Sequence, residues 1–372
     1  MSRVGVICEF NPFHNGHKFL LEKIKAEYGD ETVCVMSGNF VQRGDIAITD
    51  KYARTCAALQ NGADIVIELP TAYAVSSARI FAENGVRAAA AMGCDRLCFG
   101  AESDTGSLTE LSELLMSDDI NRKIRGYMDE GMYYPKALSL AVGEGRADII
   151  CQPNNILALE YIKACKERGI QPAAIERRGA AHDSRESSED IASASMIRGL
   201  IESGEDYHSF TPMTIEKPCS LNAIEAAILY RLKTIAADEL AQIAEVDEGL
   251  ENRLTEAAKK YNSTEEILSA VKTKRYTMAR LRRIVIQTVL GITSEIQNTP
   301  LPYLRALGLT SGRESMLSGA TLPLIVKVKA DYDRLDNSAK EIFSVDLRAA
   351  ELMNIAQNSV INEFTQGVIK QQ

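Results

Sequence analysis

Two histidines near the start of the chain stand where chemistry explains them better than packing does. His14 and His17 follow an apolar run over residues 4–8 that is typical of a buried parallel strand. The next residues, 18–24, repeat apolar side chains with helical spacing. The pair therefore lies on a strand-to-helix turn, where free backbone N–H groups and the positive helix end favour an anion. Gly16 has no Cβ to keep a phosphate away, and the imidazoles could donate to its oxygens.

A metal site and ordinary surface polarity are the alternatives for this pair. A metal site generally needs a third ligand, and the chain has only two other histidines, His182 and His208. Half of the histidines fall within four residues, in the strand–turn–helix context that phosphate motifs require. We therefore predict a nucleotide site at this turn.

A second group of polar residues precedes a later helix. Ser193 and Ser195 come before Arg198, which would lie in the first turn of that helix. Together they could supply N–H, O–H and guanidinium donors to a triphosphate. The alternative is a plain N-cap formed by Ser193 or Ser195, which is common at helix starts.

The segments that position these groups alternate between strand-like and helix-like patterns. Such alternation indicates an α/β fold with a Rossmann-like parallel sheet. Open sheets of this kind bind ligands at the carboxyl ends of their strands, so residues 9–17, 37–39 and 100–103 should meet on one edge. The predicted strands cover residues 4–8, 32–36, 63–69, 96–99 and 172–177, and the predicted helices cover 18–24, 50–61, 77–92 and 155–168.

The pattern changes near residues 210–218, after which apolar residues recur mostly at intervals of three and four. We therefore predict one domain over residues 1–210 and a mainly helical domain over 211–372, completed by a strand-like run at 322–326. The helices of this second domain are expected over residues 221–232, 236–243, 249–261, 264–271, 278–290 and 338–364.

The composition is that of an ordinary globular chain long enough for two domains. Of its 372 residues, 45% are hydrophobic and 25% are charged. No apolar run approaches the roughly 18 residues that a membrane span needs. The eight cysteines are scattered and lack the paired spacing of a zinc ribbon. We expect a cytoplasmic protein with no membrane partner.

One segment is strongly basic although the whole chain carries a net charge of −9. Residues 271–294 contain no acidic residue. RNA phosphates would suit this patch, with Tyr276 available to stack on a base. The alternative is a helix face paired with acidic neighbours such as Asp247, Glu248 and Glu251. The cations of the patch are Lys272, Lys274, Arg275, Arg280, Arg282 and Arg283.

The pairing of His-x-Gly-His with a later Ser-x-x-Arg helix start resembles the nucleotidylyltransferase superfamily. That resemblance implies attack of an oxygen nucleophile on the α-phosphate of a nucleoside triphosphate, with pyrophosphate leaving. Longer motifs, spread over nearly the whole chain, are similar to those of the bacterial tRNA(Met) cytidine acetate ligases. These motifs are EFNPFHNGH (9–17), MSGNFVQRG (36–44), VIELP (66–70), FGAE (99–102), PNNIL (153–157) and KRYT (274–277).

The family resemblance implies an ATP-dependent ligase. Such an enzyme activates acetate to acetyl-adenylate and passes the acetyl group to N4 of the wobble cytidine of elongator tRNA(Met). It implies an ATP-binding, nucleotidyltransferase-like catalytic domain over residues 1–210 and tRNA binding by residues 211–372, through the basic patch. ATP would be a co-substrate, and Mg²⁺ would bridge its leaving phosphates.

The resemblance also implies which residues contact ATP. Gly100 would let adenosine lie against the backbone, Asn154 suits an adenine edge or the ribose, and Arg177 suits the phosphates or the acyl group. Arg178 competes with Arg177, because the loop before His182 is shorter than family members usually have. The family's ATP-binding segment falls on Ile7, Cys8, Glu9, Phe10, Asn11, Pro12, Phe13, His14, Asn15, Gly16, His17, Lys18, Phe19 and Leu20.

His14 and His17 are the expected catalytic pair, and they would stabilise the α-phosphate together with the backbone amides of Asn15 and Gly16. Ser195 and Arg198 are possible further phosphate contacts. The negative charge of acetate must be offset near ATP, and the candidates are Arg43, Lys51 and Arg54, although each could equally be an ordinary solvated charge.

Two rival functions stay open. One is a nucleotidylyltransferase that makes a dinucleotide cofactor or an activated alcohol without RNA. The other is a non-catalytic RNA-binding protein that keeps a relic nucleotide site. A class I aminoacyl-tRNA synthetase shares the histidine turn, but this sequence has no Lys-Met-Ser-Lys-Ser-like loop.

Overall fold

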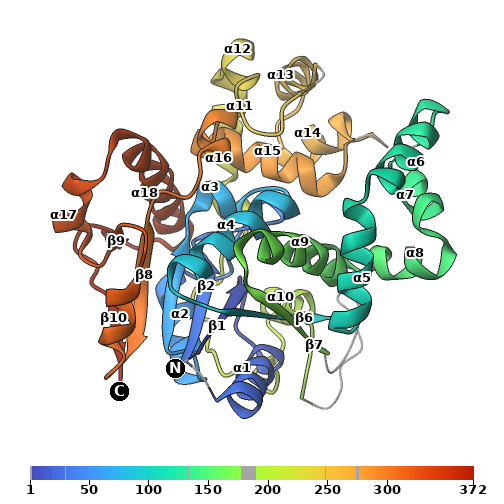
Figure 1. The fold of residues 1–372 in the computed structure, drawn as a ribbon. Helices are drawn as coiled ribbons and strands as arrows, with labels where there is room; N and C mark the ends of the chain where they lie inside the picture. Colours follow the sequence, from blue (N-terminus) through green and yellow to red (C-terminus); the bar gives the residue numbers. More distant parts are fainter. Residues whose placement is uncertain (1, 30, 133, 177–189, 248, 274–275) are drawn as a thin grey trace.

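A mostly parallel sheet forms the centre of the protein, whose computed structural model describes residues 2–29, 31–132, 134–176, 190–247, 249–273 and 276–372 (Figure 1). In this described part the strands run in the order β10-β8-β5-β2-β1-β6-β7, with β9 beside β8. The chain leaves β1 for β2 and β5 on one side and later adds β6 and β7 on the other, so β1 lies at the switch point where such sheets bind ligands. The mutually parallel strands are β1 (Arg3–Cys8), β2 (Glu31–Ser37), β5 (Ile65–Leu69), β6 (Arg96–Ala101) and β7 (Gln171–Glu176).

The predicted α/β fold is confirmed, and local capping explains where its helices begin. The Asp50 carboxylate accepts from the backbone N–H groups of Tyr52 and Ala53 at the start of α2 (Lys51–Gln60). Ser77 caps α4 (Ala78–Ala91) in the same way. The other helices that accompany the parallel strands are α1 (Asn15–Tyr28), the short α3 (Thr71–Ala74), α9 (Pro153–Arg168) and α10 (Ala194–Ser203).

Two glycines allow α4 to lie directly on β1. A Cβ added to Gly5 would come within 2.9 Å of the Ala89 side chain, and one added to Gly85 would come within 2.7 Å of the Ile7 side chain. This close approach fixes the carboxyl end of β1, from which the histidine turn departs.

Strands from the last quarter of the chain complete the sheet. β8 (Leu304–Thr310) pairs antiparallel with β5, and β9 (Leu324–Ile325) and β10 (Ile369–Gln371) both pair parallel with β8. The expectation that residues 322–326 would complete a separate helical part was wrong, because β9 belongs to the central sheet. Residues on both sides of position 210 thus share one sheet, and the proposed division of the chain there stays a prediction.

The remaining helices form two groups (Figure 1). An arm between β6 and α9, which was not predicted from the sequence, contains α5 (Thr105–Met116), α6 (Asp118–Asp129), α7 (Tyr134–Val142) and α8 (Glu144–Cys151). The second half contains η1 (Leu221–Ile224), α11 (Glu225–Thr234), α12 (Ala237–Leu240), α13 (Leu250–Lys260), α14 (Thr264–Val271), α15 (Met278–Leu290), α16 (Ser294–Asn298), η2 (Glu314–Gly319), α17 (Val328–Asp331), η3 (Tyr332–Arg334) and α18 (Asn337–Gln357).

The last predicted helix, 338–364, ends earlier than expected. Asn358 adopts a left-handed conformation, with φ of 48°, and closes α18 after Gln357. None of the helices in the described residues is long and apolar enough to cross a membrane.

A small hairpin joins the sheet edge to the helical half. It consists of β3 (Phe40–Val41) and β4 (Asp45–Ile46), with Gly44 in its turn at φ of 74°. A Cβ on Gly44 would lie only 2.4 Å from the backbone nitrogen of Arg283 in α15. Gly44 therefore serves both the left-handed turn and the direct contact between the hairpin and α15.

Candidate active site

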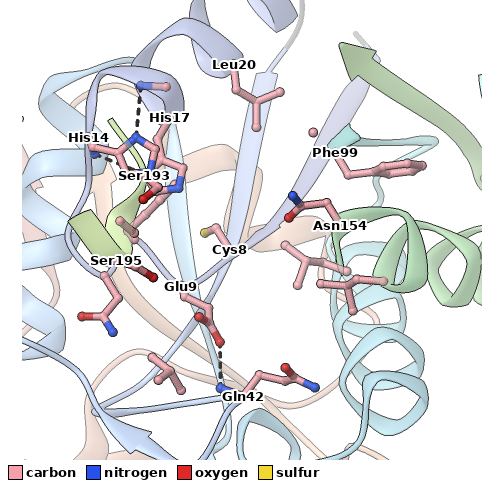
Figure 2. A pocket seen from close by; sticks show the side chains of 18 of the residues that line it. Cys8, Glu9, His14, His17, Leu20, Gln42, Phe99, Asn154, Ser193 and Ser195 are labelled. Carbon is pink, nitrogen blue, oxygen red and sulfur yellow. Dashed lines mark hydrogen bonds between the residues drawn. The ribbon is translucent and has the colours of Figure 1, made fainter. Parts of the chain in front are cut away.

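A cavity of about 570 Å³ opens at the carboxyl ends of β1, β6 and β7 (Figure 2). Its walls come from the histidine turn, the start of α10, the start of α9, the β3–β4 hairpin and α15. It is therefore placed where the sheet topology predicts a ligand. The lining residues from the expected ATP-binding segment are Ile7, Cys8, Glu9, Phe10, Asn11, His14, Gly16, His17, Phe19 and Leu20, whereas Pro12, Phe13, Asn15 and Lys18 are not among them.

The two histidines are held by reciprocal hydrogen bonds at the start of α1. Nδ1 of His14 accepts from the Gly16 N–H at 3.1 Å, and Nδ1 of His17 accepts from the His14 N–H at 3.2 Å. A neutral imidazole that accepts through Nδ1 carries its proton on Nε2. The rings stack with their centroids 3.7 Å apart, so the turn presents two imidazole donors side by side.

The residues around the pair explain why this turn has the sequence it has. A Cβ on Gly16 would approach Cε1 of His14 to 2.9 Å, so the glycine leaves room for that ring. The His17 ring packs against Phe10 and Phe13, at centroid distances of 4.9 and 5.7 Å. The aromatic residues of this motif are therefore a support for His17.

The amides of Asn15 and Gly16 do not fit their expected role. The Asn15 N–H donates to the Phe210 carbonyl at 2.9 Å, and the Gly16 N–H donates to His14. Because both amides are bonded within the protein, the expectation that they would hold the α-phosphate was wrong.

The start of α10 forms the wall beside the histidines. Ser193 is the N-cap, and its hydroxyl accepts from the Met196 N–H at 3.1 Å. Ser195 is exposed and lines the cavity with Arg198. Arg198 donates to the Asn11 carbonyl at 2.7 Å and to the Ser195 hydroxyl at 3.3 Å. The capping interpretation thus holds for Ser193. Ser195 and Arg198 line the same cavity as the histidines, and Arg198 contacts the histidine turn directly.

The opposite wall is mainly apolar and carries Gly100 and Asn154. Phe99, Leu157 and Ile175 line it, which suits a flat aromatic base. Asn154 is oriented by its amide, which donates to the Glu102 carboxylate. The FGAE and PNNIL motifs therefore meet in space, at the end of β6 and the start of α9. Arg177 and Arg178 lie outside the described residues.

A carboxylate at the end of β1 faces the same cavity. Oε1 of Glu9 accepts from the Gln42 N–H at 2.7 Å (Figure 2). Burial raises the pKa of Glu9, and the Gln42 N–H together with the charges of Arg198 and Arg43 opposes that rise.

Asp45, on the hairpin, has similar surroundings. Its carboxylate accepts from the Ile46 N–H at 2.9 Å. Burial raises the pKa of Asp45, and Arg198, the Ile46 N–H and Arg282 oppose the rise. Neither Asp45 nor Gln42 was singled out from the sequence, although both lie in or beside the MSGNFVQRG motif, whose length was a signal that this segment has a function.

The three residues expected to offset the charge of acetate differ in burial and in whether they line the cavity. Arg43 lines the cavity. Arg54 is fully buried and donates to the backbone carbonyls of Glu9 and Ser37, at 2.7 and 3.1 Å. Lys51 is 1% exposed, pairs with two buried carboxylates and does not line the cavity. Arg54 and Lys51 are therefore structural, and residues 37–39 do not line the cavity either.

The basic patch is divided by its contacts. Arg283 is 9% exposed and pairs with Glu245 at 2.6 Å, and Arg280 pairs with Asp247 at 2.6 Å. Tyr276 is buried, so the expectation that it could stack on a base was wrong. The acid-paired alternative thus describes part of the patch.

Two other cations of the patch are accessible to a partner. Lys272 is exposed, and Arg282 is exposed and lines the cavity. Lys274, Arg275 and Glu248 lie outside the described residues.

Comparison with known proteins identifies the family. The chain matches the HIGH nucleotidyl transferase family over residues 1–367. It is 37% identical over 393 aligned residues to the tRNA(Met) cytidine acetate ligase of Thermoanaerobacter sp. strain X514, with 97% of each chain covered. The chain belongs to the tRNA(Met) cytidine acetate ligase family. The protein of that name from Acetivibrio thermocellus is 33% identical, with 99% of this chain and 100% of that one covered.

Solved structures of the tRNA(Met) cytidine acetate ligase family have the same fold. Crystal structures of Thermotoga maritima TmcAL, in the apo form and bound with alpha-thio ATP, match this chain with a TM-score of 0.90. The ATP-analogue form is 28% identical and covers 100% of this chain and 99% of that one. Family membership confirms the expectations of a nucleotidyltransferase fold and of an enzyme.

Proposed function

We propose that the protein is an ATP-dependent tRNA(Met) cytidine acetate ligase that makes acetyl-adenylate and then acetylates N4 of the wobble cytidine of elongator tRNA(Met). The observation that carries the proposal is the stacked His14–His17 pair, with both Nδ1 atoms occupied, which lines one cavity together with Arg198 and an apolar wall. The names of the relatives and the ATP analogue bound to TmcAL support it.

In the first step acetate attacks the α-phosphorus of ATP and pyrophosphate leaves. Such transfers depend on positioning and on the neutralisation of charge at the phosphate oxygens. Nε2 of His14 and of His17 would donate to the α-phosphate as its oxygens become crowded with charge. Arg198, fixed by the Asn11 carbonyl, would meet the leaving phosphates with Ser195.

ATP would enter as its Mg²⁺ complex. Among the described residues, no group of three His, Cys, Asp or Glu side chains could hold a metal ion. Mg²⁺ in such sites takes most of its ligands from substrate phosphates and water, and a single carboxylate suffices from the protein. The ion would therefore be held mainly by the phosphates of ATP and by water. The ion would neutralise charge on the pyrophosphate as it leaves.

In the second step the acyl group passes to the RNA. Arg282 and Lys272 are the described cations of the basic patch that remain exposed, and Arg282 reaches the cavity itself. RNA held on this side would present its base to the acetyl-adenylate. With a tRNA as its substrate, the protein is expected to act in the cytoplasm.

Radiolabelled acetate tests the proposal. Acetate-dependent exchange of pyrophosphate into ATP is expected without tRNA, and label is expected in tRNA(Met) when it is added. Nucleotide transfer to another small molecule without any need for acetate would indicate the cofactor-forming rival. Binding of tRNA with no turnover of ATP would indicate the relic site.

A further inference from the structure

One part of the cavity wall, where Glu9 and Gln42 lie, is set apart from the labelled His14 and Asn154 (Figure 2). It is formed by Glu9, by Phe81 of α4, by Val41, Gln42, Arg43 and Asp45 of the hairpin segment, and by Arg282 of α15. We call it the hairpin lobe. Figure 2 shows Glu9 and Gln42 hydrogen-bonded to each other in this part of the cavity, away from the labelled His14 and Asn154.

We propose that the hairpin lobe receives the acceptor base and that Glu9 accepts first a hydrogen bond and then the proton from its exocyclic amine. The inference rests on the proposed function and names the subsite that serves its second step. A carboxylate is the side chain that pairs with the N4 amine of cytosine. The apolar side chains of Val41 and Phe81 suit the faces of a base that has been turned out of its stack.

The transfer step requires a proton acceptor because an amine becomes an amide. N4 attacks the carbonyl carbon of acetyl-adenylate, and a C–N bond forms. The C–O bond to the phosphate breaks, and AMP leaves with the bonding electron pair as a dianion. The N4 proton passes to the Glu9 carboxylate, which becomes neutral. Atoms and charge balance with no further reactant.

Cationic groups that face Glu9 favour its ionised form, whereas burial favours its neutral form. Arg198 approaches from α10, Arg43 from the hairpin and Arg54 from α2, and each favours the carboxylate. Tyr161 of α9 and the Cys8 thiol also face it. Burial outweighs these cations and raises the pKa of Glu9, which brings the carboxylate closer to the basicity that a general base needs.

The lobe is also connected to the surface that would hold RNA. Gly44 of the hairpin contacts the backbone of α15 at Arg282 and Arg283. Asp45, which follows Gly44, and Arg282 both line the lobe. Arg282 is exposed at its rim, where it could meet the phosphate of the nucleotide whose base enters.

Glu9→Gln tests the role of the carboxylate, because the amide oxygen can still accept from Gln42 while the side chain cannot take a proton. Two rates are measured: acetate-dependent pyrophosphate exchange, and single-turnover transfer from enzyme-bound acetyl-adenylate to tRNA. We expect transfer to fall roughly 100-fold or more, and at least about tenfold further than exchange does. Transfer by the wild type should slow at acidic pH as Glu9 becomes protonated, and transfer by the variant should not.

Glu176→Gln is the matched control, since it removes a carboxylate from the adenosine side of the same cavity. Its ratio of transfer to exchange should stay near that of the wild type, and Glu9→Asp should recover part of the transfer lost in Glu9→Gln. Equal losses of both rates in Glu9→Gln would overturn the inference. A wild-type protein that shows no acetate-dependent exchange would instead overturn the proposed function.

A second test needs no protein variant. A tRNA in which the acceptor cytidine is replaced by uridine presents a carbonyl oxygen to the Glu9 carboxylate in place of an amine. We expect the wild type to bind it roughly 5- to 100-fold more weakly than the cytidine form. The Glu9→Gln variant, whose amide can donate to that oxygen, should discriminate less. Equal binding of the two RNAs by the wild type would overturn the inference.

Discussion

Two clusters of charged residues border the same sheet and have opposite characters. The first, which we call the buried ion cluster, consists of Lys51, Glu68, Arg305 and Glu363, all less than 5% exposed. The second is formed by the charges of the hairpin lobe and its neighbour at the start of α10. Its members are Glu9, Arg43, Asp45, Arg198 and Arg282, which all line the cavity.

The charges of the buried ion cluster pair with one another. Lys51 contacts Glu68 at 2.8 Å and Glu363 at 2.9 Å, and Arg305 contacts Glu68 at 3.1 Å and also Glu363. Burial alone would raise the pKa of Glu363, but Lys51 and Arg305 hold it at about 2.

The cavity charges have a different kind of support. Glu9, Asp45 and Arg198 each hydrogen-bond to a backbone group, and this bond orients the side chain without neutralising its charge. Charged side chains that pair with one another stabilise the fold. Charged side chains that are oriented by backbone groups keep their charge available to act on a ligand.

The largest effect on activity should come from His17→Asn. The Asn side-chain oxygen can replace Nδ1 as the acceptor of the His14 N–H, while the Nε2 donor is lost. We expect acetate-dependent pyrophosphate exchange to fall roughly 100- to 1,000-fold, with little change in the denaturant midpoint. His208→Asn is the control, because His208 is exposed and bonds to Asp206. An unchanged exchange rate would remove His17 from the mechanism.

The largest effect on stability should come from Glu363→Gln. It leaves the charges of Lys51 and Arg305 buried with a single carboxylate between them, which costs about 3–5 kcal/mol in comparable pairs. Urea unfolding gives the value. The control is Glu314→Gln, which removes an exposed partner of Lys370 and should leave the midpoint where it is. If the Glu363→Gln protein were as stable as the control, the ion pairs of the buried ion cluster would not stabilise the fold.

A smaller, pH-dependent effect is expected from Asp346→Asn, beside the buried ion cluster. Burial and the charge of Glu68 raise the pKa of Asp346 to about 6. The folded protein therefore holds this proton more tightly than the unfolded chain does, and the associated stability is lost as the pH rises through about 6.

Asparagine avoids that loss, since its oxygen can accept from the Thr71 N–H and its NH2 group can donate to the Tyr303 hydroxyl, which donates to Asp346 in the wild type. The variant should gain about 1 kcal/mol over the wild type at pH 8, and the gain should shrink toward pH 5. A difference between the two proteins that does not depend on pH would show that Asp346 is ionised throughout this range.

The smallest effect concerns RNA binding. Replacing Arg282 and Lys272 with glutamine should weaken tRNA binding and lower the slope of log K against log salt by about 0.7–0.9 for each phosphate that the variant no longer neutralises. Arg334→Gln, which removes one cation at an exposed residue of η3, should leave the slope unchanged. An unaltered slope in the first variant would place the RNA elsewhere.

The fold and the centre of the site could be predicted from the sequence because both depend on local signals. Apolar β-branched runs indicated the parallel strands, and capping residues such as Asp50 and Ser77 indicated the helix starts. The place of Arg198 in the site could be predicted from the sequence because this residue follows the serines at a fixed spacing. Its bond to Asn11, 187 positions away in the chain, could not be predicted in this way.

What sequence reasoning missed depends on contacts between distant segments. β8 contains Arg305 and Gly308, which weaken its strand pattern, and both residues make sense only once β8 lies against α2 and β5. The same holds for charge. Nothing in the local sequence distinguishes the buried Arg283 from the exposed Arg282, because Glu245 approaches from a preceding loop.

The position of β8 and β10 late in the chain has a consequence during synthesis. When the first half of the chain has left the ribosome, β5 still has an open edge, and Lys51 and Glu68 still lack the residues 305 and 363 that complete their pairing. The nascent nucleotide-binding half is therefore an unfinished sheet with an aggregation-prone edge. Its maturation has to wait until these later segments have been translated.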